Sequence, residues 1–215
     1  MANGFKNEDG QVIVDRMIDV IHENRAYLSE IDGAIGDGDH GINMDKGFQL
    51  VKRALEGERV SMSEALKTLG RTLVMEIGGS MGPLYGSMFR KMARASRDDE
   101  TVTAQTLRTM LDAAVESIRE LGEAKPGDKT LVDTLDPAAK AAGAAAERGA
   151  SLEEAVDEMI AAAERGWKST EDMVARIGRS ARLGERSRGT LDAGATSCYL
   201  LLRSMGETMK ELASA

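Results

Sequence analysis

The sequence predicts an all-α fold: a single domain over residues 1–215, built as a bundle of eight antiparallel helices with its polar loops gathered at one end. The chain is rich in Ala, Leu, Met and Glu and has only three prolines, a composition that favours helices. Apolar residues recur at three- and four-residue spacing in eight segments, which is the period of an amphipathic helix. No segment alternates with period two and β-branched enrichment, so no strand is predicted.

The first four helices are predicted from apolar stripes and from residues typical of helix ends. The first covers residues 11–30 and runs into an acidic loop, and the second begins at Asn43 and ends at a glycine. Ser61 and Glu64 form a capping box for the third helix. Pro83 suits the first position of the fourth helix, which follows a glycine-rich turn.

The last four helices follow from the same signals. The fifth is predicted over residues 103–121, and the sixth is an alanine-rich helix over residues 131–148 that Pro137 is expected to kink. A second capping box at Ser151 opens the seventh helix, whose apolar stripe reaches Trp167. The eighth helix carries a final apolar stripe near the C-terminus.

Composition and charge exclude several function classes. The net charge is −8, so general binding to nucleic acid or to an anionic membrane is not expected. No run approaches eighteen apolar residues and the N-terminus has no hydrophobic signal core, so the protein is expected to be cytoplasmic. The single cysteine, Cys198, excludes an internal disulfide and a cysteine zinc site.

The stretch EIDGAIGDGDHGINM, residues 30–44, is the strongest functional signal in the chain. It holds Asp32, Asp37 and Asp39 among four glycines, which predict a tight loop rather than a helix. Crowded carboxylates repel one another unless a cation neutralises them, and oxygen ligands favour magnesium or calcium over zinc. An EF-hand is excluded, because Ile42 and Phe48 stand where that motif needs Gly and Glu. The N–H groups at the start of the next helix form a natural phosphate cradle.

Three further loops carry possible ligand chemistry. The glycine-rich turn at residues 78–83 either contacts phosphate or only lets two helices pack. Residues 122–130 are not a Walker phosphate loop, because Asp128 separates the glycine from Lys129 and no strand precedes them. Residues 175–197 contain five arginines between glycines. They predict either a solvated basic loop or a segment that closes over nucleotide phosphates.

Together, the motifs GDGDHGINM, GGSMGPLYG, KPGDKT and GRSARLGERSRGTLDAGATS resemble the nucleotide-binding subunit of dihydroxyacetone kinase. The resemblance covers nearly the whole chain. It implies a barrel of eight up-and-down helices with the nucleotide at one rim. It also implies a separate ketose-binding kinase subunit as partner, because no histidine here matches the one that binds the ketose. In systems driven by phosphoenolpyruvate a phosphocarrier subunit is a further partner.

The resemblance also implies roles for individual residues. Asp32, Asp37 and Asp39 would hold two Mg²⁺ ions that bridge the phosphates of ADP or ATP, and Arg179 would stabilise the charge that develops during transfer. The remaining residues implied to contact phosphate, sugar or base are His40, Gly41, Ile42, Asn43, Ser80, Met81, Gly122, Leu131, Asp192, Ala193 and Gly194.

Three functions stay open from the sequence. The chain is a kinase subunit, a metal-dependent phosphatase or nucleotide hydrolase that works alone, or a regulatory module that binds nucleotide or a transcription factor. The sequence does not choose between dihydroxyacetone and a tetrose such as erythrulose as acceptor, nor between retained ADP and exchanging ATP. A homodimer is expected from the alanine- and methionine-rich helical surface.

Overall fold

The computed structural model describes residues 4–215, and within them the fold is mostly helical, as predicted. The α-helices are α1 Gln11–Glu23, α2 Arg25–Ile35, α3 His40–Leu55, α4 Met62–Glu76, α5 Met81–Ser96, α6 Ala104–Leu121, α7 Val132–Glu147, α8 Leu152–Ser169 and α9 Ala193–Ser214. Short 3-10 helices cover Asn7–Asp9, Thr170–Asp172 and Ser180–Ser187. No helix in this range is long and apolar enough to cross a membrane.

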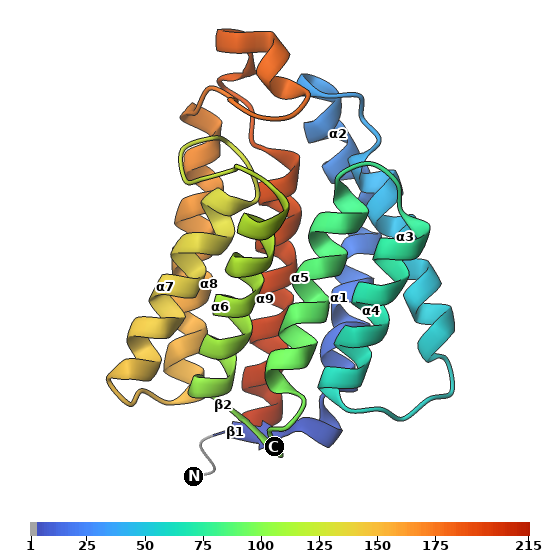
Figure 1. Ribbon diagram of the computed structural model, residues 1–215, viewed down its shortest axis with the longest axis vertical. Coiled ribbons are helices and arrows are strands. Elements are labelled where there is room, and N and C mark those ends of the chain that lie inside the picture. The colour runs from blue at the N-terminus through green and yellow to red at the C-terminus, as the bar shows by residue number, and fades with distance from the viewer. Residues whose placement is uncertain (1–3) are drawn as a thin grey trace.

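From α3 to α9, each helix packs against the next along the chain, and α9 also packs against α1. Figure 1 shows the long helices running side by side, with both described ends of the chain at the bottom. The core between them is aliphatic and Met-rich, as the composition indicates: Ile13, Met17, Met44, Met62 and Met159 are fully buried. This packing fixes the helix ends, and therefore the loops that connect them.

The structure differs from two expectations about secondary structure. The structure has strands at Gly4–Lys6 (β1) and Thr101–Thr103 (β2), which pair antiparallel with Phe5 opposite Val102. Three-residue strands are too short to show a period-two pattern. Nine α-helices occur in residues 4–215 instead of eight, because the helix predicted over residues 11–30 is two helices that meet at Asn24.

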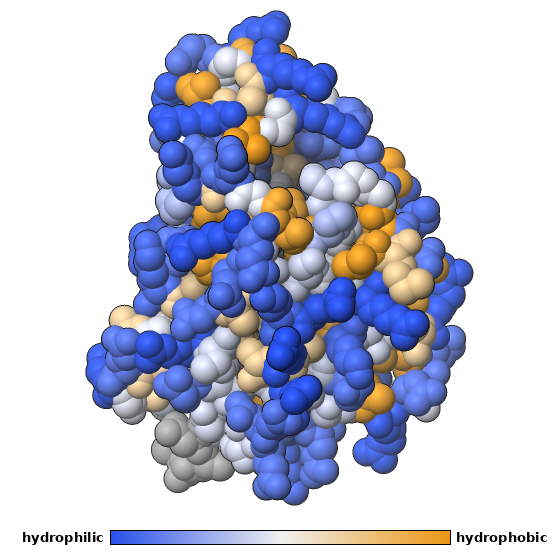
Figure 2. Space-filling view, viewed as in Figure 1, coloured by the Kyte–Doolittle hydropathy of each residue, from blue (hydrophilic) through white to orange (hydrophobic). Residues whose placement is uncertain are grey.

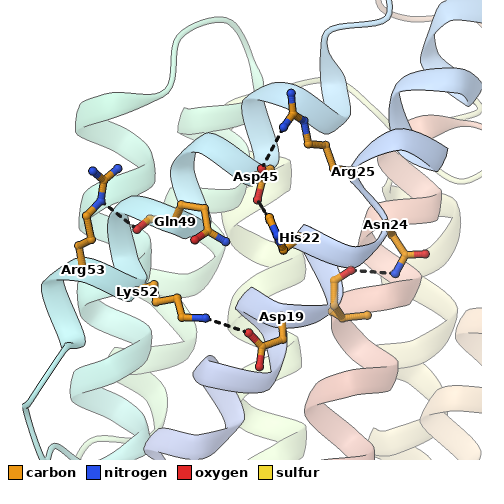
Figure 3. A network of polar contacts seen from close by, with 9 residues as sticks. Asp19, His22, Asn24, Arg25, Asp45, Gln49, Lys52 and Arg53 are labelled. Carbon is orange, nitrogen blue, oxygen red and sulfur yellow. Dashed lines mark hydrogen bonds and ion pairs between the residues drawn. The ribbon is translucent and has the colours of Figure 1, made fainter.

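Polar side chains hold the junction between α1 and α2. The spacing of apolar residues gives no sign of them. The Asn24 side-chain amide donates to the carbonyl of Val20 at 2.8 Å. Asp45, which is nearly buried on α3, lies 2.9 Å from His22 Nδ1 and 3.8 Å from the Arg25 guanidinium (Figure 3). One carboxylate therefore ties α1 and α2 to α3. These contacts set the direction of α2 as it leads into the acidic loop.

Of the two predicted capping boxes, one is complete and the other is formed only in part. Ser151 forms a complete capping box, in which its Oγ accepts from the N–H of Glu154 and the Glu154 carboxylate accepts from the N–H of Ser151. Ser61 forms only the first half of that arrangement, accepting from the N–H of Glu64. Helix α7 continues through Pro137. Satisfied N–H groups at these starts fix where the helices begin.

Helices α7 and α8 approach so closely that Gly166 has no room for a methyl group. A Cβ at Gly166 would lie 2.0 Å from the carbonyl oxygen of Asp133, whereas a Cβ at Gly143 would meet nothing closer than 4.0 Å. We expect Gly166→Ala to lower the free energy of unfolding by about 1–3 kcal/mol. The control Gly143→Ala should instead raise it by about 0.5–1 kcal/mol, because alanine favours a helix over glycine. Urea unfolding measures both, and equal effects would contradict the packing argument.

Candidate functional site

The loops singled out from the sequence lie at one end of the molecule. Figure 1 shows the α2–α3 loop, the α4–α5 turn, the α6–α7 loop and the segment before α9 together at the top. On the face that Figure 2 shows, the surface is mostly hydrophilic with scattered apolar side chains, some of them at this end. Exposed large hydrophobic residues there include Val74 and Met75 near the end of α4 and Leu121 at the end of α6.

The three aspartates of the acidic stretch converge. One carboxylate oxygen from each of Asp32, Asp37 and Asp39 lies within 4.8 Å of the others. Gly36 and Gly38 allow this: a Cβ at Gly36 would lie 2.5 Å from Asp32 Oδ1, and Gly38 has a φ of 76°. We call these three side chains the acidic cluster. The sequence placed Asp32 in a loop, but it lies in the last turn of α2, because the helix continues through Gly33 and ends at Ile35.

Arg179 is the basic side chain that reaches the acidic cluster. Its guanidinium pairs with the Asp37 carboxylate and lies 4.0 Å from a carboxylate oxygen of Asp39. About 59% of the Arg179 side chain is exposed, so the pair faces solvent. Residues about 140 positions apart are thus brought together, and the arginine segment before α9 reaches the acidic cluster through Arg179.

Helix α3 begins at His40, three residues before the predicted start, and its first turn faces the acidic cluster. The N–H of His40 donates to Asp32 Oδ2 at 3.2 Å, while the His40 imidazole lies 2.8 Å from Ser197 Oγ on α9. Ser197 is in turn 2.7 Å from the Tyr85 hydroxyl. Burial lowers the pKa of His40 to about 4, so the ring is neutral at pH 7. The backbone, not the ring, of His40 faces the carboxylates.

The start of α9 lies against the start of α7. Asp192 caps α9, its Oδ2 accepting from the N–H of Ala195 at 2.7 Å. A Cβ at Gly194 would lie 3.6 Å from the nitrogen of Leu131, so these two predicted site residues are neighbours. Burial raises the pKa of Asp192 to about 6, despite the opposing hydrogen bond from Ala195. Ala193 is buried at the first position of α9.

The raised pKa of Asp192 predicts a specific pH dependence of stability. The folded state binds this proton more tightly than the unfolded state, so the contribution of Asp192 to stability decreases as pH rises from about 4 to about 6. Asp192→Asn keeps a capping oxygen but removes the ionisation. Without metal or nucleotide, we expect the variant to gain up to about 3 kcal/mol relative to wild type between pH 4 and pH 7. Urea unfolding at several pH values measures this difference, and a constant difference would contradict it.

The remaining predicted residues lie at the same end, within their own segments. Ser80 precedes α5, where its carbonyl accepts from the N–H of Leu84, and Met81 packs partly against the core. Gly122 ends α6, donating to the carbonyl of Ile118. Ile42 is exposed on the first turn of α3, and the N–H of Asn43 donates to the carbonyl of Asp39.

The α6–α7 loop is organised by its own side chains. The Asp133 carboxylate accepts from the N–H groups of Gly127 at 2.6 Å and Thr130 at 2.8 Å. The Lys129 ammonium is buried and donates to carbonyls of the segment before α9. This lysine is therefore not placed as a Walker lysine, in agreement with the sequence. Sequence reasoning missed its role, because no local pattern shows which distant carbonyls a lysine meets.

Comparisons with known proteins identify the family of this chain. The DAK2 domain family matches residues 34–207. The ADP-binding subunit DhaL of PEP-dependent dihydroxyacetone kinase 1 from Listeria innocua is 40% identical over 189 residues, covering 87% of this chain and 89% of that protein. This chain belongs to the DhaL family.

One further relative and one solved structure are similar to this DhaL-family chain. The ADP-binding subunit DhaL of the PEP-dependent dihydroxyacetone kinase from Escherichia coli is 34% identical over 90% of this chain and 92% of that protein. A crystal structure of the dihydroxyacetone kinase from C. freundii, in complex with AMP-PNP and Mg²⁺, superposes with a TM-score of 0.69 at 21% identity. It covers 95% of this chain and 34% of that one, and at this identity it supports the fold alone.

Proposed function

We propose that this DhaL-family protein is the nucleotide-binding subunit of a short-ketose kinase, with dihydroxyacetone as the first candidate acceptor. The observation that carries the proposal is the acidic cluster beside a helix start and an arginine, in a chain closely related to ADP-binding subunits of dihydroxyacetone kinases. It acts as a phosphotransferase only within a complex, because the ketose is bound by a separate subunit. The exposed apolar residues near the loop end are available for that partner to cover.

The donor set fits a hard divalent cation. Three carboxylates offer oxygens within 4.8 Å of one another, and no sulfur or neutral imidazole takes part. Asp32, Asp37 and Asp39 would hold one or two Mg²⁺ ions. When bound, Mg²⁺ supplies charge neutralisation and orientation of the phosphates during phosphoryl transfer. The guanidinium of Arg179 pairs with Asp37, so an ion at this cluster would compete with it for that carboxylate.

The residues around the acidic cluster bind and orient the phosphates in this proposal. The first N–H groups of α3, from His40 to Asn43, include groups without an intrahelical acceptor, and they suit phosphate oxygens. Arg179 stabilises the negative charge that develops on the transferring group. Base and sugar contacts come from the α4–α5 turn, the α6–α7 loop and the start of α9, through Ser80, Met81, Gly122, Leu131, Asp192, Ala193 and Gly194.

The proposal extends to assembly. We infer that α1 and α2 together count as one of eight helices in a closed barrel, supported by the packing of α9 against both α8 and α1. The partners are a ketose-binding subunit and, where phosphoenolpyruvate is the phosphoryl source, a phosphocarrier protein. The homodimer expected from the sequence stays a prediction, which the mass in solution would test.

A reconstitution experiment tests the function. The purified chain is mixed with a ketose-binding subunit, and phosphorylation of dihydroxyacetone or erythrulose is followed with either ATP or a phosphocarrier protein as donor. Ketose phosphorylation that needs both subunits supports the proposal, and the effective donor shows whether the nucleotide exchanges. Phosphate release without the partner subunit would instead indicate a phosphatase. Nucleotide binding with no transfer to either ketose would indicate a regulatory module.

A further inference from the structure

Lys129 is a charged side chain that lies buried near the site. Its residue is only 1% exposed, although lysine is rarely buried. The ammonium donates to three backbone carbonyls, those of Met173 at 3.2 Å, Ser187 at 2.5 Å and Thr190 at 2.6 Å. Three acceptors match the three N–H donors of an ammonium. The buried charge is therefore fully hydrogen-bonded, as its burial requires.

The three carbonyls belong to both ends of one segment. We call residues 173–190 the arginine strap, and Lys129 binds Met173 at one end and Ser187 and Thr190 at the other. One further hydrogen bond joins the strap to the α6–α7 loop: the N–H of Arg176 donates to the carbonyl of Asp128 at 3.1 Å. The strap therefore has its two ends held on the α6–α7 loop, while Arg179 between them reaches Asp37.

The backbone at Lys129 is also unusual. Its φ is 62°, and within residues 4–215 it is the one non-glycine residue with a positive φ. Such a conformation costs free energy and persists where the surroundings over-determine it. The Asp133 carboxylate, which accepts from the N–H of Thr130, and the three strap carbonyls are those surroundings. A glycine would adopt this φ without strain, whereas lysine adopts it at a cost.

We propose that Lys129 is a positioning residue that holds the arginine strap closed, so that Arg179 stands over the acidic cluster. The inference rests on the proposed role of Arg179 in phosphoryl transfer. Lys129 itself touches neither the acidic cluster nor the reacting groups; it acts through the strap.

Hydrogen exchange of the full chain, without nucleotide or metal, tests the structural half of the proposal. Lys129→Met should accelerate exchange at residues 175–190 about tenfold or more, since each lost bond to a charged donor is stabilising. Exchange in α4 and α5 should stay at the wild-type rate. Lys129→Gly relieves the strained φ, so this variant should fold well and should still show accelerated hydrogen exchange in the strap. The matched control Lys125→Met removes an exposed lysine of the same loop and should leave the strap unchanged.

Slow strap exchange in both Lys129 variants would overturn the proposal. Equally fast strap exchange in Lys125→Met would also overturn it, because the acceleration would then come from the change in net charge. If Lys129→Met proves too unstable to assay, Lys129→Gly decides alone.

A double-mutant cycle in the reconstituted kinase tests the functional half. Because Lys129 acts through Arg179, Lys129→Met in an Arg179→Met background should cost no further turnover, although it slows the wild-type background. Additive losses would overturn the proposal and assign Lys129 a separate role. If Arg179→Met itself leaves transfer intact, the proposed function of Arg179 has failed. If Arg179→Met slows transfer but Lys129→Met does not, only the positioning role of Lys129 is refuted.

Discussion

Asp37→Asn is expected to lower the rate of phosphoryl transfer by about three orders of magnitude when the ketose-binding subunit is present. Asparagine has nearly the same volume as aspartate but no charge, so the fold should persist while the acidic cluster loses one of three anionic ligands. Affinity for a divalent cation should fall with it. The measurements are turnover in the reconstituted kinase and calorimetric titration with Mg²⁺ and ADP.

Glu30→Gln is the matched control for Asp37→Asn. It removes the same charge from an exposed position on α2, a few residues before Asp32. Its turnover should stay close to that of wild type. Full activity of Asp37→Asn would show that the cluster does not hold the catalytic metal, and the electrostatic argument for this site would fail.

The helix starts that carry a serine cap were predictable because their signals are local. Ser61 and Ser151 cap the helices that the sequence assigned to them, and the glycines of the acidic stretch permit its tight turn. The junction at Asn24 was not predictable from apolar spacing, since both helices keep the same stripe across it. It depends on Asp45, which lies 21 positions further along the chain and binds both His22 and Arg25.

In the candidate site too, the features set by nearby residues were predictable, and those that depend on distant residues were not. Convergence of Asp32, Asp37 and Asp39 follows from three carboxylates spaced by glycines within eight residues. The identity of the arginine that reaches them does not follow from the residues of a strap with five arginines, and only the family resemblance pointed to Arg179. Lys129 and the Ser197–Tyr85 pair were missed, because their partners lie in segments more than 40 positions away.

Arg179→Met should change two measurements in opposite directions. Phosphoryl transfer should fall by about three orders of magnitude, the smaller end of what an arginine contributes to this chemistry. Binding of Mg²⁺ to the nucleotide-free chain should instead strengthen several-fold, because the guanidinium that pairs with Asp37 no longer competes with the ion for the carboxylates. Turnover and metal titration on the same preparation measure the two effects.

Arg182→Met provides the comparison for Arg179→Met. Arg182 is an exposed arginine of the same strap, and its backbone N–H donates to the carbonyl of Arg179, a bond that a side-chain change leaves in place. Both variants lose one positive charge, so a general charge effect would appear equally in both. A loss of transfer together with a loss of Mg²⁺ affinity in Arg179→Met would point to a disordered site rather than to a missing guanidinium. A loss of transfer together with a gain of Mg²⁺ affinity would identify the guanidinium itself as the group that stabilises the transferring phosphoryl.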